Sequence, residues 1–486
     1  MIENTWPIAL TIAVYMAMCL LLGYLAFRRT NTIGDFILGG RSLGSWVTAL
    51  SAQATDMGGW LLMGLPGLAY ASGFSAVWMA AGLATGTWAN WRFVAAPLRA
   101  RTEALDALTL PDYFERRFND RSRVLRTISA VLILVFFTLY TSSGFVAAGR
   151  LFESLFGIDY VQAMLLGSAV MLAYTCFGGF LAVSWSDVLQ GTLMFVALVL
   201  VAVLGLMLAG GIDETIAALE ARSPQLLDPD VGGTLGAIGV ISLVSWGLGY
   251  PGQPHIVARF MAIRSTPELK TSRRVAMGWV ITVLAAAIIV GLTGVLVLPE
   301  PLHDAQVEKV FIFMSTAFLH PVLAGICLSG ILAAVMGTAA AQLLVASSAF
   351  AQDIYKGLLR GSSEGTELLW TGRIAVLVIA ALAFFLAMNP ESTVLNLVAW
   401  AWAGFGSAFG PAIVLSLYWP RMTRDGALVG MIVGGLTVML WRQGHGALFE
   451  LYEMVPGVVL STLSIWMVSL LGGDVPAGRR SEQQRS

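Results

Sequence analysis

Apolar runs long enough to cross a membrane recur along almost the whole 486-residue chain. A helix needs about 20 apolar residues to span the hydrocarbon core of a bilayer, and only helices and closed barrels satisfy their backbone hydrogen bonds there. Charged residues make up 12% of the chain, whereas a soluble domain contains about 25%. The pattern therefore predicts an all-α integral membrane protein with about thirteen transmembrane helices. The expected spans are residues 6–27, 46–71, 74–97, 124–149, 160–181, 188–210, 234–255, 275–298, 322–350, 370–388, 394–418, 426–441 and 453–472.

The distribution of the basic residues tests this arrangement. With the N-terminus outside, 24 of the 28 Lys and Arg residues fall in cytoplasmic segments, five of them from Arg259 to Arg274. The loop 211–233, on the opposite side, is acidic. Cytoplasmic loops of membrane proteins carry such an excess of positive charge. The sequence therefore predicts an N-terminus outside, a C-terminus inside and a short cytoplasmic tail at 473–486.

The second span contains an acid and helix-breaking residues at mid-depth. Residues 51–67 read SAQATDMGGWLLMGLPG, in which Asp56 is followed by Gly58, Gly59 and Pro66. A carboxylate at that depth costs roughly 2.5–3.5 kcal/mol, and each glycine weakens a helix by about 1 kcal/mol relative to alanine. Irregular backbone in a membrane persists only where it lines a cavity or is buried in protein. We expect this helix to break and to present its peptide groups to a transport site.

A second interrupted segment, SWGLGYPGQP at residues 245–254, follows five spans later in a helix of opposite direction. Two interrupted helices at matching places in two inverted halves are typical of the midplane binding site of a secondary transporter. The alternative is that the glycines only allow close helix packing, as small residues do in membranes. The matching positions favour an inverted repeat with a binding site.

The ninth span offers oxygen ligands for a cation. In its segment LAAVMGTAAAQLLVASS, Ala334, Thr338 and Gln342 share one helical face. Na+ prefers hard oxygen ligands such as carbonyls and hydroxyls. The Thr338 hydroxyl could act together with carbonyl oxygens near Ala54 and Met57 in the broken span. The alternative is a packing groove in which the threonine bonds to its own helix.

Three aromatic residues are candidates for a substrate site. Trp246 and Tyr250 lie four residues apart, hence on one helical face, just before the second interruption. Tyr140 lies deep in the fourth span. Aromatic walls suit a small ligand with an apolar ring or side chain. The alternative is that these residues belong to the aromatic belts at the membrane interfaces.

Two charged residues near cytoplasmic ends of spans have open roles. Asp187 follows the fifth span, where we expect it to cap the sixth helix. Arg41 is either a charge at an inner gate or one more cytoplasmic positive residue. The histidines are scattered and the three cysteines lie in apolar runs, so neither a metal site nor a disulfide follows. Without nucleotide-binding or nucleophile motifs, neither an enzymatic activity nor a nucleic-acid partner is expected.

Five motifs resemble the solute:sodium symporter family and, within it, the members that carry proline. In chain order they are SAQATDMGGWLLMGLPG, YTCFGGFLAVSWSDVLQ, SWGLGYPGQPHIVARFM, LAAVMGTAAAQLLVASS and AWAGFGSAFGP. The resemblance implies the leucine-transporter fold, with two inverted repeats of five helices in a single membrane domain. The implied domain is 1–472, with repeats at about 46–210 and 234–418 and extra helices at 6–27, 426–441 and 453–472.

The resemblance also implies a site at the two breaks. The Na+ ligands would be backbone oxygens and one hydroxyl, from Ala54, Met57, Ala334 and Thr338. Three charged residues would support the ion or act in coupling and gating: Asp56, Arg41 and Asp187. L-proline would lie against residues of both breaks and the fourth span: Gly58, Gly59, Tyr140, Trp246, Tyr250 and Pro254.

The chain departs from the family at two of these places. The family has a serine before the threonine of the ninth span, where this chain has Gly337. One ligand oxygen is then missing, and a water, Ser51 or an altered geometry must replace it. Gly58 also stands where the family has a serine near the substrate. Proton coupling through Asp56 therefore stays an alternative to Na+.

These features predict a Na+-coupled symporter that imports L-proline by alternating access, without covalent chemistry and without a cofactor. It would be a multi-pass protein of the plasma membrane, the inner membrane of a bacterium, surrounded by membrane lipid. One alternative is an importer of another small amino acid or of a monocarboxylate, coupled to Na+ or H+. Another is a solute sensor with the same fold.

Overall fold

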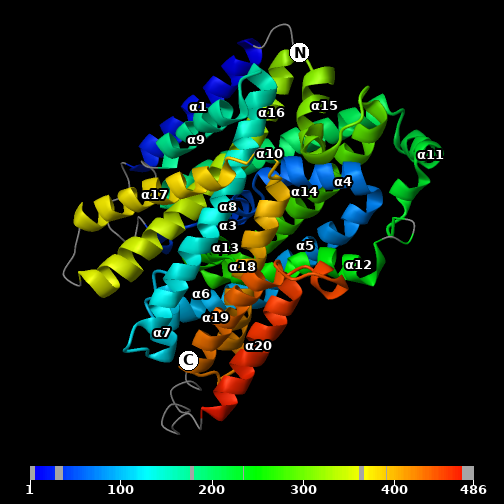
Figure 1. Cartoon of the computed structure of the whole chain (residues 1–486). Helices are drawn as coiled ribbons and strands as arrows, with labels where there is room; N and C mark the ends of the chain where they lie inside the picture. Colours follow the sequence, from blue (N-terminus) through cyan, green and yellow to red (C-terminus); the bar gives the residue numbers. More distant parts are fainter. Residues whose placement is uncertain are drawn as a thin grey trace.

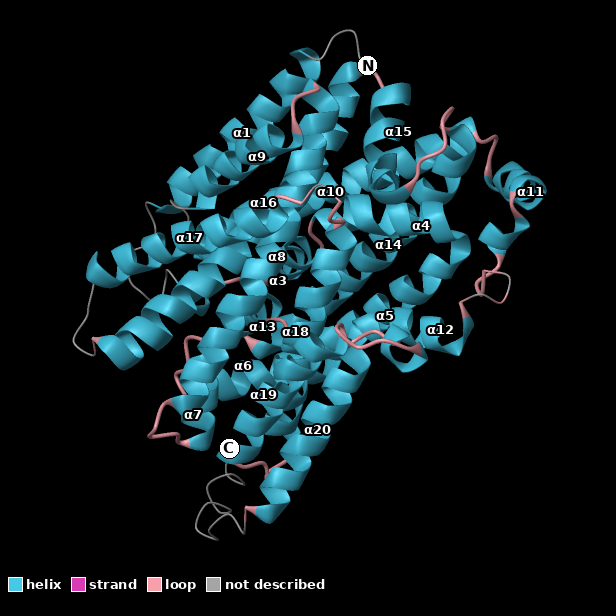
Figure 2. Cartoon of the chain, in the orientation of Figure 1, coloured by secondary structure: helices cyan, strands magenta, loops and turns pink. Residues whose placement is uncertain are grey.

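The computed structural model describes residues 6–27, 37–175, 180–231, 233, 235–360, 366–389 and 391–472. Long helices lie side by side and slant in a common direction (Figure 1). Figure 2 shows that loops join these helices and that the described residues form no strand. An isolated parallel bridge joins Leu43 and Ile263. The all-α prediction is confirmed.

The first half of the chain ends with a long helix and a shorter one that follows it. Its main elements are α1 (Trp6–Phe27), η1 (Gly39–Arg41), α3 (Ser45–Asp56), η2 (Trp60–Gly64), α4 (Leu65–Ser72), α5 (Ala76–Ala89), η4 (Asn90–Val94), α6 (Ala95–Ala104), α7 (Leu110–Phe118), α8 (Val124–Phe156), α9 (Tyr160–Thr175), α10 (Phe180–Leu208) and α11 (Ile212–Arg222).

The second half begins with another interrupted helix and ends with a helical hairpin. Its main elements are α12 (Gly236–Val244), η6 (Ser245–Gly252), α13 (Pro254–Ala262), α14 (Leu269–Val297), η8 (Asp304–Lys309), α15 (Val310–Phe318), α16 (Pro321–Ser348), η9 (Ala349–Leu359), α17 (Thr366–Ala387), α18 (Val394–Tyr418), α19 (Arg424–Trp441) and α20 (Met454–Leu471).

Nine helical stretches of the described chain are long and apolar enough to cross a membrane. These nine stretches are fewer than the thirteen expected spans for three reasons. Two expected spans are interrupted, α1 counts as a shorter apolar helix, and α9 has only 16 residues. The expected segments are helical over most of their described residues, apart from their ends and the breaks at Met57, Gly58 and Gln253. The exact count of thirteen crossings stays a prediction.

The interior of the bundle surrounds the first interrupted helix. α3 packs against α10, α13, α14 and α16, while α18 packs against α8 and η6. Small residues let the backbones approach, since a side chain on Gly247 of η6 would meet the backbone of Gly82 in α5, and one on Gly82 would meet that of Val244. Residues 51–67 are buried throughout. The polar break is thus enclosed by protein and does not face lipid.

Candidate functional site

The first interruption lies between α3 and η2. α3 ends at Asp56, and Met57 leaves helical geometry with φ −86° and ψ 77°. The Asp56 carbonyl oxygen accepts a hydrogen bond from Gly58 N at 3.0 Å. The Trp60 indole N–H (3.1 Å) and the Tyr140 hydroxyl (3.2 Å) also donate to this oxygen. The predicted break in this span is confirmed, and side chains of two other positions hold it.

Thr338 of α16 meets the break from the other side. Its hydroxyl donates to the Ala54 carbonyl oxygen across 3.3 Å. A Cβ atom added to Gly58 would lie only 2.8 Å from that hydroxyl oxygen. Met57 forms the end of α3, and the buried Ala334 lies one helical turn before Thr338. The four expected cation ligands therefore sit on two elements that touch at this point.

The Asp56 side chain lies at the same break, near the Tyr140 and Tyr250 side chains. It is fully buried. The Tyr250 hydroxyl faces this carboxylate from η6. The described residues contain no group of three or more His, Cys, Asp or Glu that could hold a metal ion. The chemistry of the site is therefore that of neutral oxygens plus one negative charge, which suits a monovalent cation.

Asp187 forms a buried ion pair with an unexpected partner. It lies about two turns inside α10, so the prediction that it caps this helix is wrong. Its Oδ2 accepts a hydrogen bond from Ser51 Oγ at 2.6 Å and lies 3.5 Å from Arg259 Nη2. Arg259 belongs to α13 and is fully buried, so the prediction that its charge lies in a cytoplasmic loop is also wrong. Ser51, Asp187 and Arg259 together connect α3, α10 and α13.

Three of the expected substrate residues line one small cavity. Gly58, Gly59 and Tyr140 surround a space of about 10 Å³ beside the first break. Ser143 of α8 and Gln342 of α16 complete its polar wall. The cavity therefore lies directly next to the candidate cation ligands.

Trp246 and Tyr250 approach this region through other aromatic rings. The Trp246 ring stacks on Tyr452 with centroids 5.4 Å apart and lies 6.4 Å from the ring of Trp60. The Tyr250 ring meets the edge of Trp402 at 5.0 Å. Both residues belong to η6, the second interruption. They form an aromatic wall behind the first break and do not line its small cavity.

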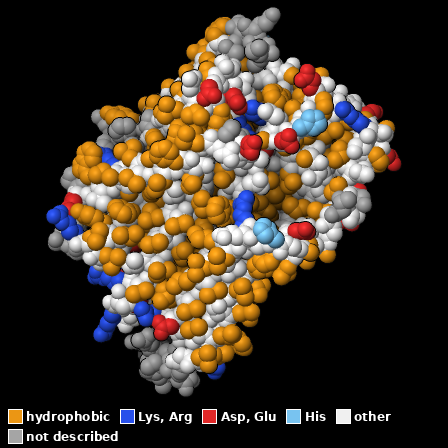
Figure 3. Space-filling view, in the orientation of Figure 1, with side chains coloured by type: hydrophobic (Ala, Val, Ile, Leu, Met, Phe, Trp, Pro, Cys, Tyr) orange, Lys and Arg blue, Asp and Glu red, His pale blue; other side chains and the backbone are white. Residues whose placement is uncertain are grey.

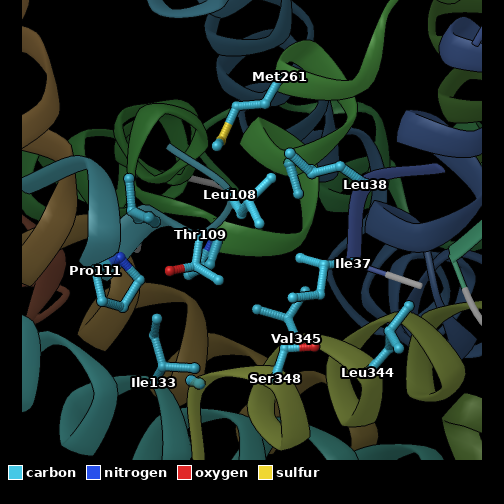
Figure 4. Close-up of a pocket in the computed structure, with 14 residues that line it drawn as sticks. Ile37, Leu38, Leu108, Thr109, Pro111, Ile133, Met261, Leu344, Val345 and Ser348 are labelled. Atoms are coloured by element: carbon cyan, nitrogen blue, oxygen red, sulfur yellow. The ribbon is translucent and has the colours of Figure 1, made fainter. Parts of the chain in front are cut away.

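Pro254 lies apart from the other expected substrate residues. It starts α13 and lines a separate cavity of about 30 Å³. Figure 4 shows apolar side chains around this space, with Thr109 and Ser348 as the labelled side chains that carry a hydroxyl. A polar cavity of about 320 Å³ shares three of its wall residues and carries four basic side chains. The shared residues are Ile37, Leu108 and Thr109, and the basic ones are Arg116, Arg123, Arg126 and Lys356. The molecule is therefore hollow on the side of α7 and η9.

The opposite side is closed by a buried ion pair. Arg150 Nη1 lies 2.5 Å from Glu308 Oε2. The Glu308 carboxylate also accepts hydrogen bonds from Val394 N (2.9 Å) and Leu395 N (3.0 Å), so it caps the start of α18. Burial raises the pKa of Glu308, against the opposing effect of the Arg150 charge. These contacts join η8 to α8 and to the start of α18.

Arg41 fastens a different part of the molecule. Its guanidinium donates to the carbonyl oxygens of Met261 (2.9 Å), Thr102 (3.0 Å) and Ala107 (2.9 Å). These bonds tie η1 to α6 and to the end of α13. Arg41 does not contact the first break, and its role in gating stays a prediction.

Sequence reasoning missed three residues of this region, which are Trp60, Arg259 and Trp402. Trp60 carried a usable signal, because an indole four residues after a helix end can reach back to the freed carbonyl. The others gave no local signal, since their contacts depend on which helices pack together.

Comparison with known proteins decides the family. Residues 36–434 match the sequence profile of the sodium:solute symporter family. The chain belongs to this family. A sodium/proline symporter of Salmonella typhimurium strain LT2 is 50% identical over 472 residues, which cover 96% of this chain and 93% of that protein. The osmoregulated proline transporter OpuE of Bacillus subtilis strain 168 is 48% identical over 467 residues, covering 96% and 94%.

A solved structure extends the likeness to the whole fold. The substrate-bound, outward-open structure of a Na+-coupled sialic acid symporter has a TM-score of 0.76 and 21% sequence identity. The match covers 96% of this chain and 98% of that one. This sodium:solute symporter family member thus has the fold of a secondary transporter, as the resemblance implied, and is a multi-pass membrane protein.

Proposed function

We propose that this chain is a Na+-coupled symporter that imports L-proline by alternating access. One observation carries the proposal: the Thr338 hydroxyl donates to the Ala54 carbonyl across the broken span, in the turn of helix that ends at Asp56. The relatives that are about half identical are named as sodium/proline symporters or proline transporters. Such a symporter requires oxygen ligands for a cation beside a cavity for its substrate.

The cation would be bound where α3 ends. Ala54, Met57 and Ala334 would supply backbone oxygens, and Thr338 its hydroxyl. Neutral oxygens of this kind replace the hydration shell of Na+. The Asp56 carboxylate would offset the charge of the ion at a depth where an uncompensated charge is costly.

The substrate would lie between the two breaks. The helical segment that starts after Gly58 and Gly59 begins at the small cavity, where its positive dipole end would lie. Such a half-helix is suited to an amino-acid carboxylate. Tyr140, Trp246 and Tyr250 would enclose the apolar ring. Pro254 would then act on the path of release through the cavity of Figure 4.

The topology proposed is thirteen spans with the N-terminus outside, in the plasma membrane of a bacterium. In Figure 1, α1 begins and α20 ends at opposite ends of the molecule, which favours an odd number of crossings. Figure 3 shows acidic side chains gathered at the end that carries α11 and α15, and basic ones near α7. The proposed repeats are about 46–210 and 234–418, with the remaining helices outside them. The tail 473–486 lies outside the described residues.

Coupling would use the buried pair of Asp187 and Arg259. α3 and α13 belong to the first spans of the two proposed repeats, and Ser51, Asp187 and Arg259 join them. A movement of one repeat against the other would therefore act directly on these bonds. Arg41 would act similarly at the inner end of the same two elements.

The driving force is sufficient for accumulation. One positive charge crossing 100 mV supplies about 2.3 kcal/mol, and a tenfold Na+ gradient adds about 1.4 kcal/mol. The test is uptake of labelled proline into proteoliposomes on which Na+ and pH gradients are imposed separately. We expect uptake with an inward Na+ gradient alone. Uptake with a pH gradient alone would instead establish proton coupling, and no proline uptake under either gradient would contradict the proposed substrate.

A further inference from the structure

Gly337 of α16 leaves a space that another side chain fills. A Cβ atom added to Gly337 would lie 2.6 Å from Gln190 Oε1, 3.2 Å from Asp187 Oδ1 and 3.5 Å from the Ala54 carbonyl oxygen. Gln190 and Asp187 come from α10, and Ala54 comes from α3. Three oxygens of two other helices therefore converge on the place where a side chain at position 337 would begin.

Two of these oxygens lack hydrogen-bond donors. Gln190 and Asp187 are both fully buried, and neither Gln190 Oε1 nor Asp187 Oδ1 has a partner among the described residues. A buried acceptor without a donor costs free energy of folding. A bound cation would satisfy several such acceptors at once, because it needs no donor geometry from any of them.

Ser51, another candidate for the oxygen that Gly337 lacks, is already held by two hydrogen bonds. Its hydroxyl donates to Asp187 Oδ2 at 2.6 Å and accepts from Arg259 Nε at 3.1 Å. Gln190 is held differently, since its Nε2 lies 3.2 Å from the Tyr15 hydroxyl of α1. The amide nitrogen therefore lies at Tyr15 and the amide oxygen lies at Gly337.

We propose that Gln190 Oε1 is a ligand of the transported cation in this chain and takes the place of the hydroxyl that a serine at position 337 would supply. An amide oxygen is a hard, neutral donor of the kind Na+ prefers. The inference rests on the proposed Na+ coupling, and it explains how the site keeps its number of oxygens although position 337 has no side chain.

The first test compares two variants that each remove one end of the Gln190 contacts. Gln190→Met removes the oxygen and keeps the length of the side chain, whereas Tyr15→Phe leaves the oxygen in place and removes the hydroxyl that meets the amide nitrogen and Cys19. Purified protein without proline is titrated with Na+ at constant ionic strength in choline, and the thermal unfolding midpoint is followed. We expect Gln190→Met to raise the half-saturating Na+ concentration about tenfold, and Tyr15→Phe by less than about threefold.

The second test changes position 337 and leaves Gln190 in place, so it does not depend on the stability of Gln190→Met. Alanine and serine there would both displace Gln190 Oε1, but only serine returns an oxygen. We expect Gly337→Ala to raise the half-saturating Na+ concentration roughly tenfold and Gly337→Ser to stay within about threefold of the unmodified protein.

Three outcomes overturn the assignment of Gln190. They are an unchanged Na+ response in Gln190→Met, equal losses in Gln190→Met and Tyr15→Phe, and equal losses in Gly337→Ala and Gly337→Ser. If the unmodified protein is not stabilised by Na+ more than by K+ or choline, the coupling ion proposed above is wrong and this assignment falls with it. If Na+ stabilises the protein and no Gln190 or Gly337 variant alters this response, the assignment of Gln190 as a ligand is wrong. The proposed Na+-coupled symport is then unaffected.

Discussion

The two interrupted spans use the same backbone device in different surroundings. The first, between α3 and η2, departs from helical geometry over only a few residues, carries Asp56 and meets the Thr338 hydroxyl. The second is η6, eight residues of tighter 3₁₀ geometry that contain Pro251 and no charged side chain. Its glycines lie against backbone of α5 and against the ring of Trp402. The first break is polar and the second is packed.

The Asp56 carbonyl of the first break and two carbonyl oxygens of η6 accept side-chain N–H groups, whereas the Ala54 carbonyl does not. In η6, Trp402 Nε1 donates to the Trp246 carbonyl at 2.8 Å, and Asn90 Nδ2 donates to the Tyr250 carbonyl at 3.2 Å. At the first break the Ala54 carbonyl receives only the Thr338 hydroxyl at 3.3 Å, which a cation can replace. An inverted pair of broken helices therefore need not hold two ions. Under the proposed function, the ion would belong to the first break and the apolar part of the substrate to the second.

The largest effect is expected from the one charge that distinguishes the first break. Asp56→Asn keeps the shape of the side chain and removes the charge that would offset a bound cation. We expect Na+-driven proline uptake to fall at least about a hundredfold, because losing one partner of a buried charge pair costs several kcal/mol. Uptake in proteoliposomes at saturating proline measures it.

Asp425→Asn is the matched control, since Asp425 is exposed and pairs only with Arg424 at the surface. Uptake of this variant should stay near that of the unmodified protein, because exposed ion pairs contribute little. If Asp56→Asn transports as well as Asp425→Asn, the first break does not hold the ion and the contrast between the two breaks disappears.

The next effect concerns packing at the second break. Gly247 of η6 faces the backbone of Gly82 with no room for a methyl group. Gly247→Ala should lower the free energy of unfolding by about 1–3 kcal/mol, the usual cost of overpacking, and should reduce proline affinity without a specific effect on Na+. Thermal unfolding and proline binding measure the two parts.

Gly278→Ala provides its control, because a Cβ atom at Gly278 of α14 meets nothing within 4 Å. This variant should be as stable as the unmodified protein. Equal stability of Gly247→Ala and Gly278→Ala would show that η6 is not held by close packing.

The sequence was sufficient to predict what local chemistry dictates. The apolar runs indicated the helices, and glycines after a buried acid indicated the first break. The partners across the bundle were less accessible. Asp187 was expected at a helix end and Arg259 in a loop, yet both are buried in one ion pair. The sequence pattern does not show whether a charged residue near a predicted helix boundary lies inside or outside the helix. Pro254 was expected at the substrate, but the bend of η6 turns it toward another cavity.

A smaller effect is expected from the hydroxyl that closes the first break. Thr338→Val keeps the branched shape and removes the donor to the Ala54 carbonyl. The Na+ concentration for half-maximal uptake should rise about tenfold, the loss expected for one oxygen ligand. Thr282→Val, in which the lost hydroxyl is exposed and bonds only to its own helix, should leave it unchanged. An unchanged Na+ requirement in both variants would remove Thr338 from the site.

The smallest effect is expected from the aromatic wall of the second break. Trp246→Phe keeps a ring against Tyr452 but shortens its reach toward Trp60. Because aromatic contacts contribute about 0.5–1.5 kcal/mol beyond their buried area, proline affinity should fall roughly threefold to tenfold. The Na+ requirement should not change, since Trp246 touches none of the candidate cation ligands. Trp88→Phe, at an exposed position on α5, should alter neither quantity. A Trp246 variant that changes the Na+ requirement while proline affinity stays constant would reverse the division of labour between the two breaks.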